Sequence, residues 1–154
     1  MARSRKQSGS SDTSKLPESP IFFVDRCLGR RAFPEPLREC GLLVELHDDH
    51  FDVVASDEKW LSEVGRRGWI VLTRDLRIRY RAIEREAALA NGVRMISLTA
   101  RRLSAEELGR AFAASIDRVN RFLTSHPRPF IATMGRAGDL RIVKERGAPR
   151  RSPS

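Results

Sequence analysis

The chain has 154 residues, of which 40% are hydrophobic and 32% charged, and its formal net charge is +9. This composition is typical of one soluble globular domain that is long enough to bury a core. No apolar run approaches the roughly 20 residues that span a bilayer, and the N-terminal stretch contains no apolar segment of the signal-peptide type. These features exclude a membrane-spanning protein and predict a cytoplasmic location.

The basic residues are mostly arginine and are spread along the whole chain. Only four of the 29 basic residues are lysine, and residues 1–20 and 145–154 each carry +2, which leaves +5 in between. The planar guanidinium group binds phosphate well, so the bias toward arginine is consistent with nucleic-acid binding. A compositional bias on an ordinary solvated surface explains it equally well. Only the position of the arginines can decide between these interpretations.

Both ends of the chain have the composition of disordered basic tails. Residues 1–20 are rich in Ser, Gly and charge, residues 145–154 are basic and contain proline, and residues 21–144 form the predicted domain. The two cysteines, Cys27 and Cys40, are too few for a disulfide framework and lack the spacing of a zinc site. We predict that both are reduced, buried thiols, because free cysteine is among the most buried residue types.

Short apolar runs and helix-type patterns alternate within the predicted domain. The predicted strands are residues 21–24, 42–46, 69–73 and 93–98. The first predicted helix lies within residues 28–40, where Pro34 and Pro36 make it irregular or delay its start to near Pro36. The other predicted helices are residues 57–67 capped by Ser56, residues 82–90, and a long helix that opens with the capping box Ser104–Glu107 and runs to Leu123. Residues 47–56 are predicted to be a polar loop, and residues 130–134 and 140–144 to be a hairpin or edge strand.

Strands that alternate with helices predict an α/β fold with three layers, α/β/α, around a central, mainly parallel sheet. In such sheets ligands lie outside the carboxyl ends of the strands. Asp25 directly follows the first strand, Asp75 comes shortly after the third, and Asp57 begins the helix that is entered from the second. We therefore expect these three acids to converge at one edge of the sheet.

Converging carboxylates either share a proton or bind a cation, and aspartate oxygens suit Mg²⁺ or Mn²⁺. Such a metal acidifies its bound water and offsets charge on a phosphodiester under attack, which requires no histidine or cysteine nucleophile. For Asp57 a role in the first turn of its helix competes with metal binding.

The third strand is followed by a cluster of side chains that can bind phosphates and stack on bases. These candidate substrate-binding residues are Arg74, Arg77, Arg79, Tyr80 and Arg81. Because they surround Asp75, they predict a polyanionic substrate at the acid site.

Four segments of the chain resemble the PIN-like nuclease domains, in particular the compact VapC-type toxins of toxin–antitoxin systems. The segments are FFVD with LGRR (residues 22–31), HDDHF (47–51), DEKWL (57–61) and GWIVLTRD with RIRYR (68–81). The resemblance covers about residues 21–134, and the order and spacing of the segments are more specific than any one of them.

The resemblance implies a parallel-sheet fold and a metal-dependent endoribonuclease, acting as the toxin of a type II toxin–antitoxin pair. Its acid motif corresponds to Asp25, Asp57 and Asp75, with Glu58 as a competing ligand, and its cofactor is Mg²⁺ or Mn²⁺. We expect RNA and a cognate antitoxin as partners, allow for a homodimer, and expect no membrane association.

One departure from the family pattern favours an alternative function. Many such domains have a further acid shortly after the position of Asp75, but residues 76–79 here are Leu, Arg, Ile and Arg. Three alternatives follow: the site holds one metal tightly, Asp48 or Asp49 completes it, or the chain is a weakened or inactive module that binds RNA or an antitoxin. A phosphoacceptor receiver domain is disfavoured, because paired acids after the first strand and a lysine after a late strand are both missing.

The segment His47–His50 has three open interpretations. Two histidines that flank two acids could form an independent transition-metal site, could order the loop at the rim, or could assist the acid site. No third soft ligand is apparent elsewhere in the sequence, so ordering of the loop is the preferred role.

Overall fold

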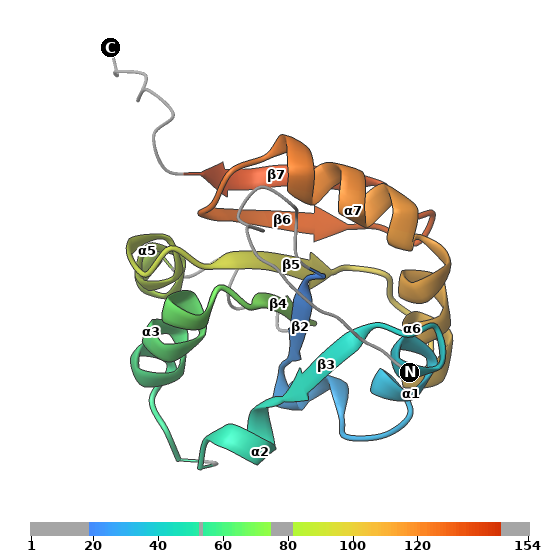
Figure 1. Ribbon diagram of the computed structural model, residues 1–154, viewed down its shortest axis with the longest axis horizontal. Helices are drawn as coiled ribbons and strands as arrows, with labels where there is room; N and C mark the ends of the chain where they lie inside the picture. Colours follow the sequence, from blue (N-terminus) through green and yellow to red (C-terminus); the bar gives the residue numbers. More distant parts are fainter. Residues whose placement is uncertain (1–18, 53, 75–81, 146–154) are drawn as a thin grey trace, which may run out of the picture.

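The computed structural model describes residues 19–52, 54–74 and 82–145 (Figure 1). The strands are β2 (Ile21–Val24), β3 (Leu43–Leu46), β4 (Ile70–Thr73), β5 (Arg94–Leu98), β6 (Phe130–Met134) and β7 (Leu140–Glu145). The helices are the 3₁₀ turn η2 (Arg26–Leu28), α1 (Pro34–Glu39), α2 (His47–His50), α3 (Asp57–Arg67), α5 (Ala82–Ala90), α6 (Ala105–Ala114) and α7 (Ile116–Ser125).

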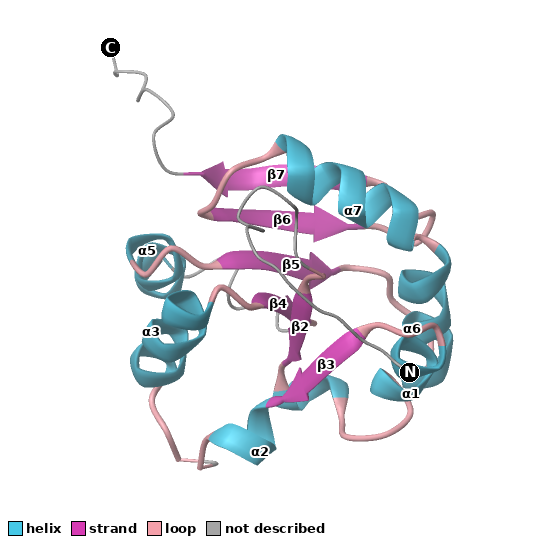
Figure 2. Ribbon diagram, viewed as in Figure 1, coloured by secondary structure: helices cyan, strands magenta, loops and turns pink. Residues whose placement is uncertain are grey.

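The six strands form a single sheet in the order β3-β2-β4-β5-β6-β7. Every neighbouring pair is parallel except β6 and β7, which are antiparallel with a register irregularity between Ile131 and Ala132. Helices cover both faces of the sheet, α3 and α5 on one side and α1, α6 and α7 on the other (Figure 2). The predicted three-layer α/β/α fold with a mainly parallel sheet and a C-terminal edge hairpin is therefore confirmed.

Alternate residues of each central strand supply two separate apolar cores. In β2, Phe22 and Val24 pack with α1, α6 and α7, whereas Phe23 packs with α3 and α5. All three side chains are almost completely buried. A strand that is apolar on both faces is what a parallel sheet between two helical layers requires.

Two predicted caps form as expected. The Ser56 side chain accepts a hydrogen bond from the Lys59 amide at the start of α3, and Gly68 ends the same helix in the left-handed conformation at φ 74°. Ser104 and Glu107 form the full capping box of α6. These local signals fix the helix ends and hence the points at which the chain enters β4 and leaves β5.

The predicted long helix after Ser104 is wrong, because it is divided at Ser115 into α6 and α7. The turn between β6 and β7 packs against this junction. The Arg118 guanidinium donates to the Ala137 carbonyl at 3.0 Å, and a Cβ atom on Gly138 would lie 2.6 Å from Ser115 Oγ. Tertiary packing at Ser115 thus overrides a sequence pattern that is continuous in helical spacing.

One further prediction about local structure is wrong. The segment predicted as a polar loop begins with the short helix α2, because the His47 ring is buried among Phe23, Phe51 and Trp60. The helix expected within residues 28–40 begins at Pro34, which agrees with its expected late start, since proline is suited to a first helical turn.

The described ranges include no helix that is both long and apolar enough to cross a bilayer.

Candidate active site

Asp25 and the end of β4 lie side by side at the carboxyl edge of the sheet. Val24 is paired with Leu72 in the parallel register, and the Asp25 amide donates to the Leu72 carbonyl at 3.0 Å. After β2 the chain continues to α1 on one face of the sheet, whereas after β4 it continues to α5 on the other face. Divergence of two neighbouring connections is the topological feature at which α/β sheets bind their ligands.

Both carboxylate oxygens of Asp25 are held by hydrogen bonds. The Thr73 hydroxyl donates to Oδ2 at 2.7 Å, the Cys27 thiol donates to the same oxygen at 3.2 Å, and the Arg26 amide donates to Oδ1 at 2.8 Å. Thr73 is buried and Asp25 is half-buried. The structure therefore holds this carboxylate in one orientation at the boundary between the sheet and solvent.

Cys27 contributes to the site through a thiol that stays protonated. Burial, and then the charge of Asp25, raise the pKa of the Cys27 thiol to about 11. The Arg74 amide donates to its sulfur at 3.3 Å, so Cys27 also connects the turn after β2 to the end of β4. The predicted burial of both cysteines is wrong, since each residue as a whole is exposed, although the Cys27 sulfur itself contacts Asp25, Thr73 and the Arg74 amide.

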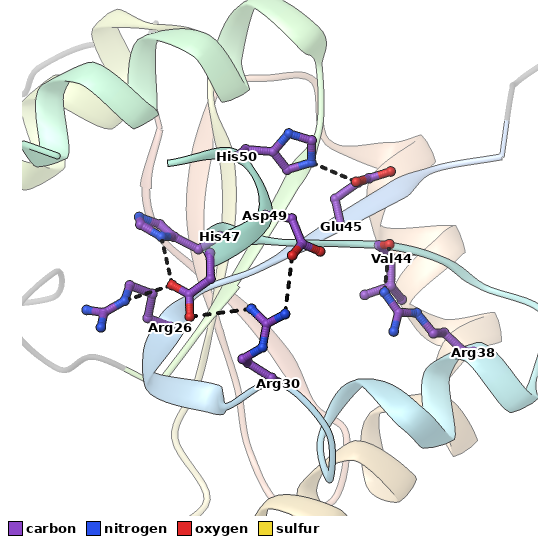
Figure 3. Close-up of polar contacts among 9 residues, drawn as sticks. Arg26, Arg30, Arg38, Val44, Glu45, His47, Asp49 and His50 are labelled. Carbon is purple, nitrogen blue, oxygen red and sulfur yellow. Dashed lines mark hydrogen bonds and ion pairs between the residues drawn. The ribbon is translucent and has the colours of Figure 1, made fainter. Parts of the chain in front are cut away.

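A second polar cluster is built on α2 and includes Arg26, the residue that follows Asp25 (Figure 3). Arg26 Nε lies 2.9 Å from Asp48 Oδ1, and Arg30 contacts Asp48 at 3.5 Å and Asp49 at 3.3 Å. Burial tends to raise the pKa of Asp48, but the hydrogen bond and charges of the two arginines outweigh it and lower that pKa below its usual value. Asp48 and Asp49 are thus engaged by arginines.

The two histidines of α2 point to different partners. The His47 ring is buried in the aromatic core of the α3 face, with Nδ1 3.6 Å from Asp48. His50 Nε2 instead lies 2.7 Å from Glu45 on β3 (Figure 3). In the part of the chain that the structure describes, no three His, Cys, Asp or Glu side chains are grouped so as to hold a metal. The geometry of the described histidines therefore supports the role of ordering this segment.

The other predicted site residues are placed only in part. Asp57 is the first residue of α3, but its side chain lies outside the described part of the structure, and Glu58 is exposed in the same turn. Arg74 Nη2 donates to the Leu103 carbonyl at 2.9 Å, which connects the end of β4 to the segment before α6. Five predicted residues lie outside the described ranges, namely Asp75, Arg77, Arg79, Tyr80 and Arg81.

Sequence reasoning missed four residues around Asp25. No functional role was predicted for Thr73, Cys27, Arg26 or Arg30, although the first three of these lie within two residues of a predicted acid. Two features of the sequence could have identified them. Thr73 is a polar residue at the last position of a buried strand, and Arg26 and Cys27 follow closely after Asp25. Which of them contacts the carboxylate depends on the η2 turn, and a 3₁₀ turn of three residues leaves no periodic pattern.

Thr73 also belongs to a row of hydroxyl residues across the sheet. The parallel register pairs Thr73 with Ser97 on β5, and Ser97 with Thr133 on β6. The Ser97 side chain is fully buried, and its Oγ has no hydrogen-bond partner among the described residues. The carboxyl edge is therefore polar on the α5 face, directly beside Asp25.

A family model described as PIN like domain matches residues 20–100, a range that includes β2 to β5 and Asp25. The chain belongs to the PIN-like domain family. A protein of Mycobacterium tuberculosis named "Putative ribonuclease VapC45" is 29% identical over 136 residues, which cover 86% of this chain and 98% of that protein. No solved structure matches the chain.

Membership of the PIN-like family agrees with the geometry at the carboxyl edge. The matched range contains Asp25, Asp57 and Asp75, the three acids of the predicted motif. Of these, Asp25 is the one whose side chain the structure describes, and its oxygens are of the type that Mg²⁺ and Mn²⁺ prefer.

Proposed function

We propose that the PIN-like domain, residues 21–144, is a divalent-metal-dependent endoribonuclease that acts as the toxin of a type II toxin–antitoxin pair. The observation that carries the proposal is the hydrogen bond from Thr73 to Asp25. It joins the end of β2 to the end of β4, two residues before Asp75. The relative from M. tuberculosis, whose name describes a ribonuclease, supports the same reaction class.

The residues proposed to hold Mg²⁺ or Mn²⁺ are Asp25, Asp57 and Asp75, with Glu58 as an alternative to Asp57. A bound divalent ion acidifies its water and offsets charge on the phosphodiester. The chain's own contribution at Asp25 is orientation, because Thr73 and Cys27 donate to Oδ2 and leave Oδ1 with a single backbone donor. A fixed carboxylate loses little entropy when it binds a ligand.

The proposed RNA-binding residues come directly after β4 in the sequence and lie on both sides of Asp75 along the chain. They are Arg74, Arg77, Arg79, Tyr80 and Arg81. Guanidinium groups bind phosphate oxygens in pairs of hydrogen bonds, and a tyrosine ring stacks on an unpaired base. We propose single-stranded RNA as the substrate, since only unpaired bases are open to stacking.

A second candidate function is an RNA- or antitoxin-binding module without turnover. Two observations favour it. No acid occupies residues 76–79, and the nearby Asp48 and Asp49 are already paired with Arg26 and Arg30. An acid that must break ion pairs before it can bind a metal is a poor substitute for a missing ligand.

The deciding experiment is cleavage of a single-stranded RNA by the full chain with Mn²⁺, compared with the Asp75→Asn variant. We expect Asp75→Asn to abolish cleavage while its thermal stability stays near that of the wild type. Asp117→Asn, an exposed acid on α7, has the same charge change and should cleave normally. Equal rates for Asp75→Asn and wild type would disprove the assignment, and metal-independent RNA binding without cleavage by the wild type would establish the binding module.

A further inference from the structure

The sheet has a cavity at its amino-terminal edge, opposite the edge that holds Asp25. The cavity has a volume of about 670 Å³ and lies between the start of β2, the α3–β4 junction, the start of β5 and the second half of α7. Its lining includes Ile21, Arg67, Trp69, Arg94, Asn120 and Thr124. The basic, amide and hydroxyl groups share the lining with apolar side chains, which is typical of small-molecule sites.

Two guanidinium groups meet at Gly68, on the wall of this cavity. Arg94 is half-buried, and its Nη2 donates to the Gly68 carbonyl at 3.3 Å. The Arg128 guanidinium packs over the same glycine, so a Cβ atom at Gly68 would lie 3.3 Å from Arg128 Nη1. In contrast with Arg67, which is paired with Glu63, neither Arg94 nor Arg128 has a carboxylate partner among the described residues.

This arrangement is electrostatically unfavourable without an anion. Burial, and then the charge of Arg128, lower the pKa of Arg94. Arg94 lines the cavity and Arg128 meets it at Gly68, so the two cations repel each other, and no described acidic side chain lines the cavity to offset them. An anion between the two guanidinium groups removes the repulsion and satisfies their free N–H donors.

We propose that this amino-edge cavity binds a phosphate group of a nucleotide, with Arg94 and Arg128 as the phosphate-binding residues. Phosphate is favoured over a carboxylate side chain because the cavity falls within the roughly 300–1,000 Å³ of ligand pockets, and its apolar wall can accommodate a base or ribose. Asn120 and Thr124 supply polar groups for the sugar. The inference rests on the proposed function in one respect: RNA, the proposed substrate, is named beside a free nucleotide as a source of the phosphate.

The test is a binding measurement that does not depend on cleavage. The full chain in EDTA is titrated with a 2′-O-methyl single-stranded oligonucleotide, which cannot be cleaved through its 2′-hydroxyl, and separately with adenosine 5′-monophosphate. We expect Arg128→Gln and the double variant Arg94→Gln/Arg128→Gln to lower affinity at least tenfold for one or both ligands. The salt dependence of oligonucleotide binding should become shallower by about one to two phosphate contacts in the double variant.

Arg110→Gln is the matched control, because Arg110 is an exposed arginine on α6 that is paired with Glu106. It should change affinity by less than about twofold. A loss confined to the oligonucleotide identifies RNA as the source, and a loss for both ligands identifies any nucleotide phosphate. Affinities in Arg128→Gln equal to wild type would overturn the proposal, and so would equal displacement of the nucleotide by an oligo-glutamate peptide. Arg128 is exposed, so its variant keeps the test valid if the change at Arg94 impairs folding.

Because the acid site binds no metal in EDTA, a failure of this test leaves the nuclease proposal standing. Conversely, the absence of cleavage activity would not contradict the proposed phosphate site, because the binding measurement does not depend on cleavage.

Discussion

The Thr73 hydroxyl and the Asp25 carboxylate are joined by a hydrogen bond of 2.7 Å, although 48 positions of sequence separate the two residues. Thr73 is the last residue of β4, and Asp25 is the first residue after β2. The bond therefore connects two neighbouring strand ends at the carboxyl edge. It makes the orientation of an acid depend on a buried side chain that has no charge of its own.

Replacement of Thr73 by valine should reduce activity more than stability. Valine keeps the shape of threonine but cannot donate to Asp25, so the carboxylate loses its shortest side-chain hydrogen bond. We expect a decrease in RNA cleavage of roughly 10- to 100-fold, as is typical when a partner that orients a metal ligand is removed. The free energy of unfolding should fall by only about 1 kcal/mol, measured by urea denaturation.

Thr73→Ser is the matched control, because serine keeps the hydroxyl and loses only a methyl group. It should retain most of the cleavage activity. If Thr73→Val cleaves RNA as fast as Thr73→Ser, orientation of Asp25 by this hydroxyl is not important for the reaction.

The Cys27 thiol should react slowly with alkylating reagents although the residue is exposed. Its pKa of about 11 means that little thiolate is present at pH 8, and only the thiolate reacts. In a Cys40→Ala background, we expect iodoacetamide to modify Cys27 at least tenfold more slowly than it modifies the same chain in urea. Asp25→Asn removes one of the charges that raise this pKa, so it should speed up the modification; no change would mean that the two groups do not interact.

The same group predicts a loss of stability at high pH. The folded-state pKa of Cys27, about 11, lies above its ordinary value of 9.0, so the stability that it contributes is complete below pH 9 and is lost as the pH rises toward 11. The wild type should therefore lose more stability between pH 9 and pH 11 than Cys27→Ser, whose hydroxyl does not ionise. Parallel pH profiles of the two melting temperatures would contradict the assignment.

Asp48→Asn should strengthen RNA binding while it slightly loosens α2. The change removes the acidic partner of Arg26 and one of the two acidic partners of Arg30, beside Asp25. Because exposed ion pairs contribute about 0–1 kcal/mol, we expect a stability loss within that range and a gain of roughly threefold in affinity for single-stranded RNA at low salt. Asp117→Asn is the charge-matched control and should gain less. Equal gains would show that net charge, not the freed arginines, controls binding.

Gly65→Ala should destabilise the fold, although the same change in an exposed helix normally stabilises it by about 1 kcal/mol. A Cβ atom at Gly65 would lie 1.9 Å from the Asn91 carbonyl oxygen, at the end of α5. Either α3 or the end of α5 must move, so we expect a loss of roughly 1–3 kcal/mol in the free energy of unfolding. Ser62→Ala, at an exposed position of the same helix, should be neutral or slightly stabilising.

The elements with strong local signals could be predicted from the sequence. The first strand and the helix over residues 57–67 have the bounds that were expected, because an apolar run and a serine cap mark their ends directly. The predicted long helix was wrong because the break at Ser115 is set by the turn around Gly138, which is distant in sequence. The α2 helix was missed because the burial of His47 depends on Phe23 and Trp60, which come from two other segments.

Only part of the candidate site could be predicted from the sequence. Asp25 was identified because an acid that ends an apolar strand is conspicuous in a sequence. Its contacts with Thr73 and Cys27 could not be predicted, since they depend on strand register and on the geometry of a short turn. Convergence of Asp57 and Asp75 on Asp25 remains a prediction, because neither side chain lies in the described part of the structure.

Phe23 connects the end of β2 to both tryptophans, so tryptophan fluorescence is sensitive to changes at that strand end. Its ring stacks on both tryptophans of the protein, with centroids 5.6 Å from Trp60 and 5.8 Å from Trp69, and it lies two residues before Asp25 on the same strand. Any ligand that shifts the end of β2 must disturb this three-ring stack. Intrinsic fluorescence can therefore follow titrations of the unlabelled protein with manganese or RNA.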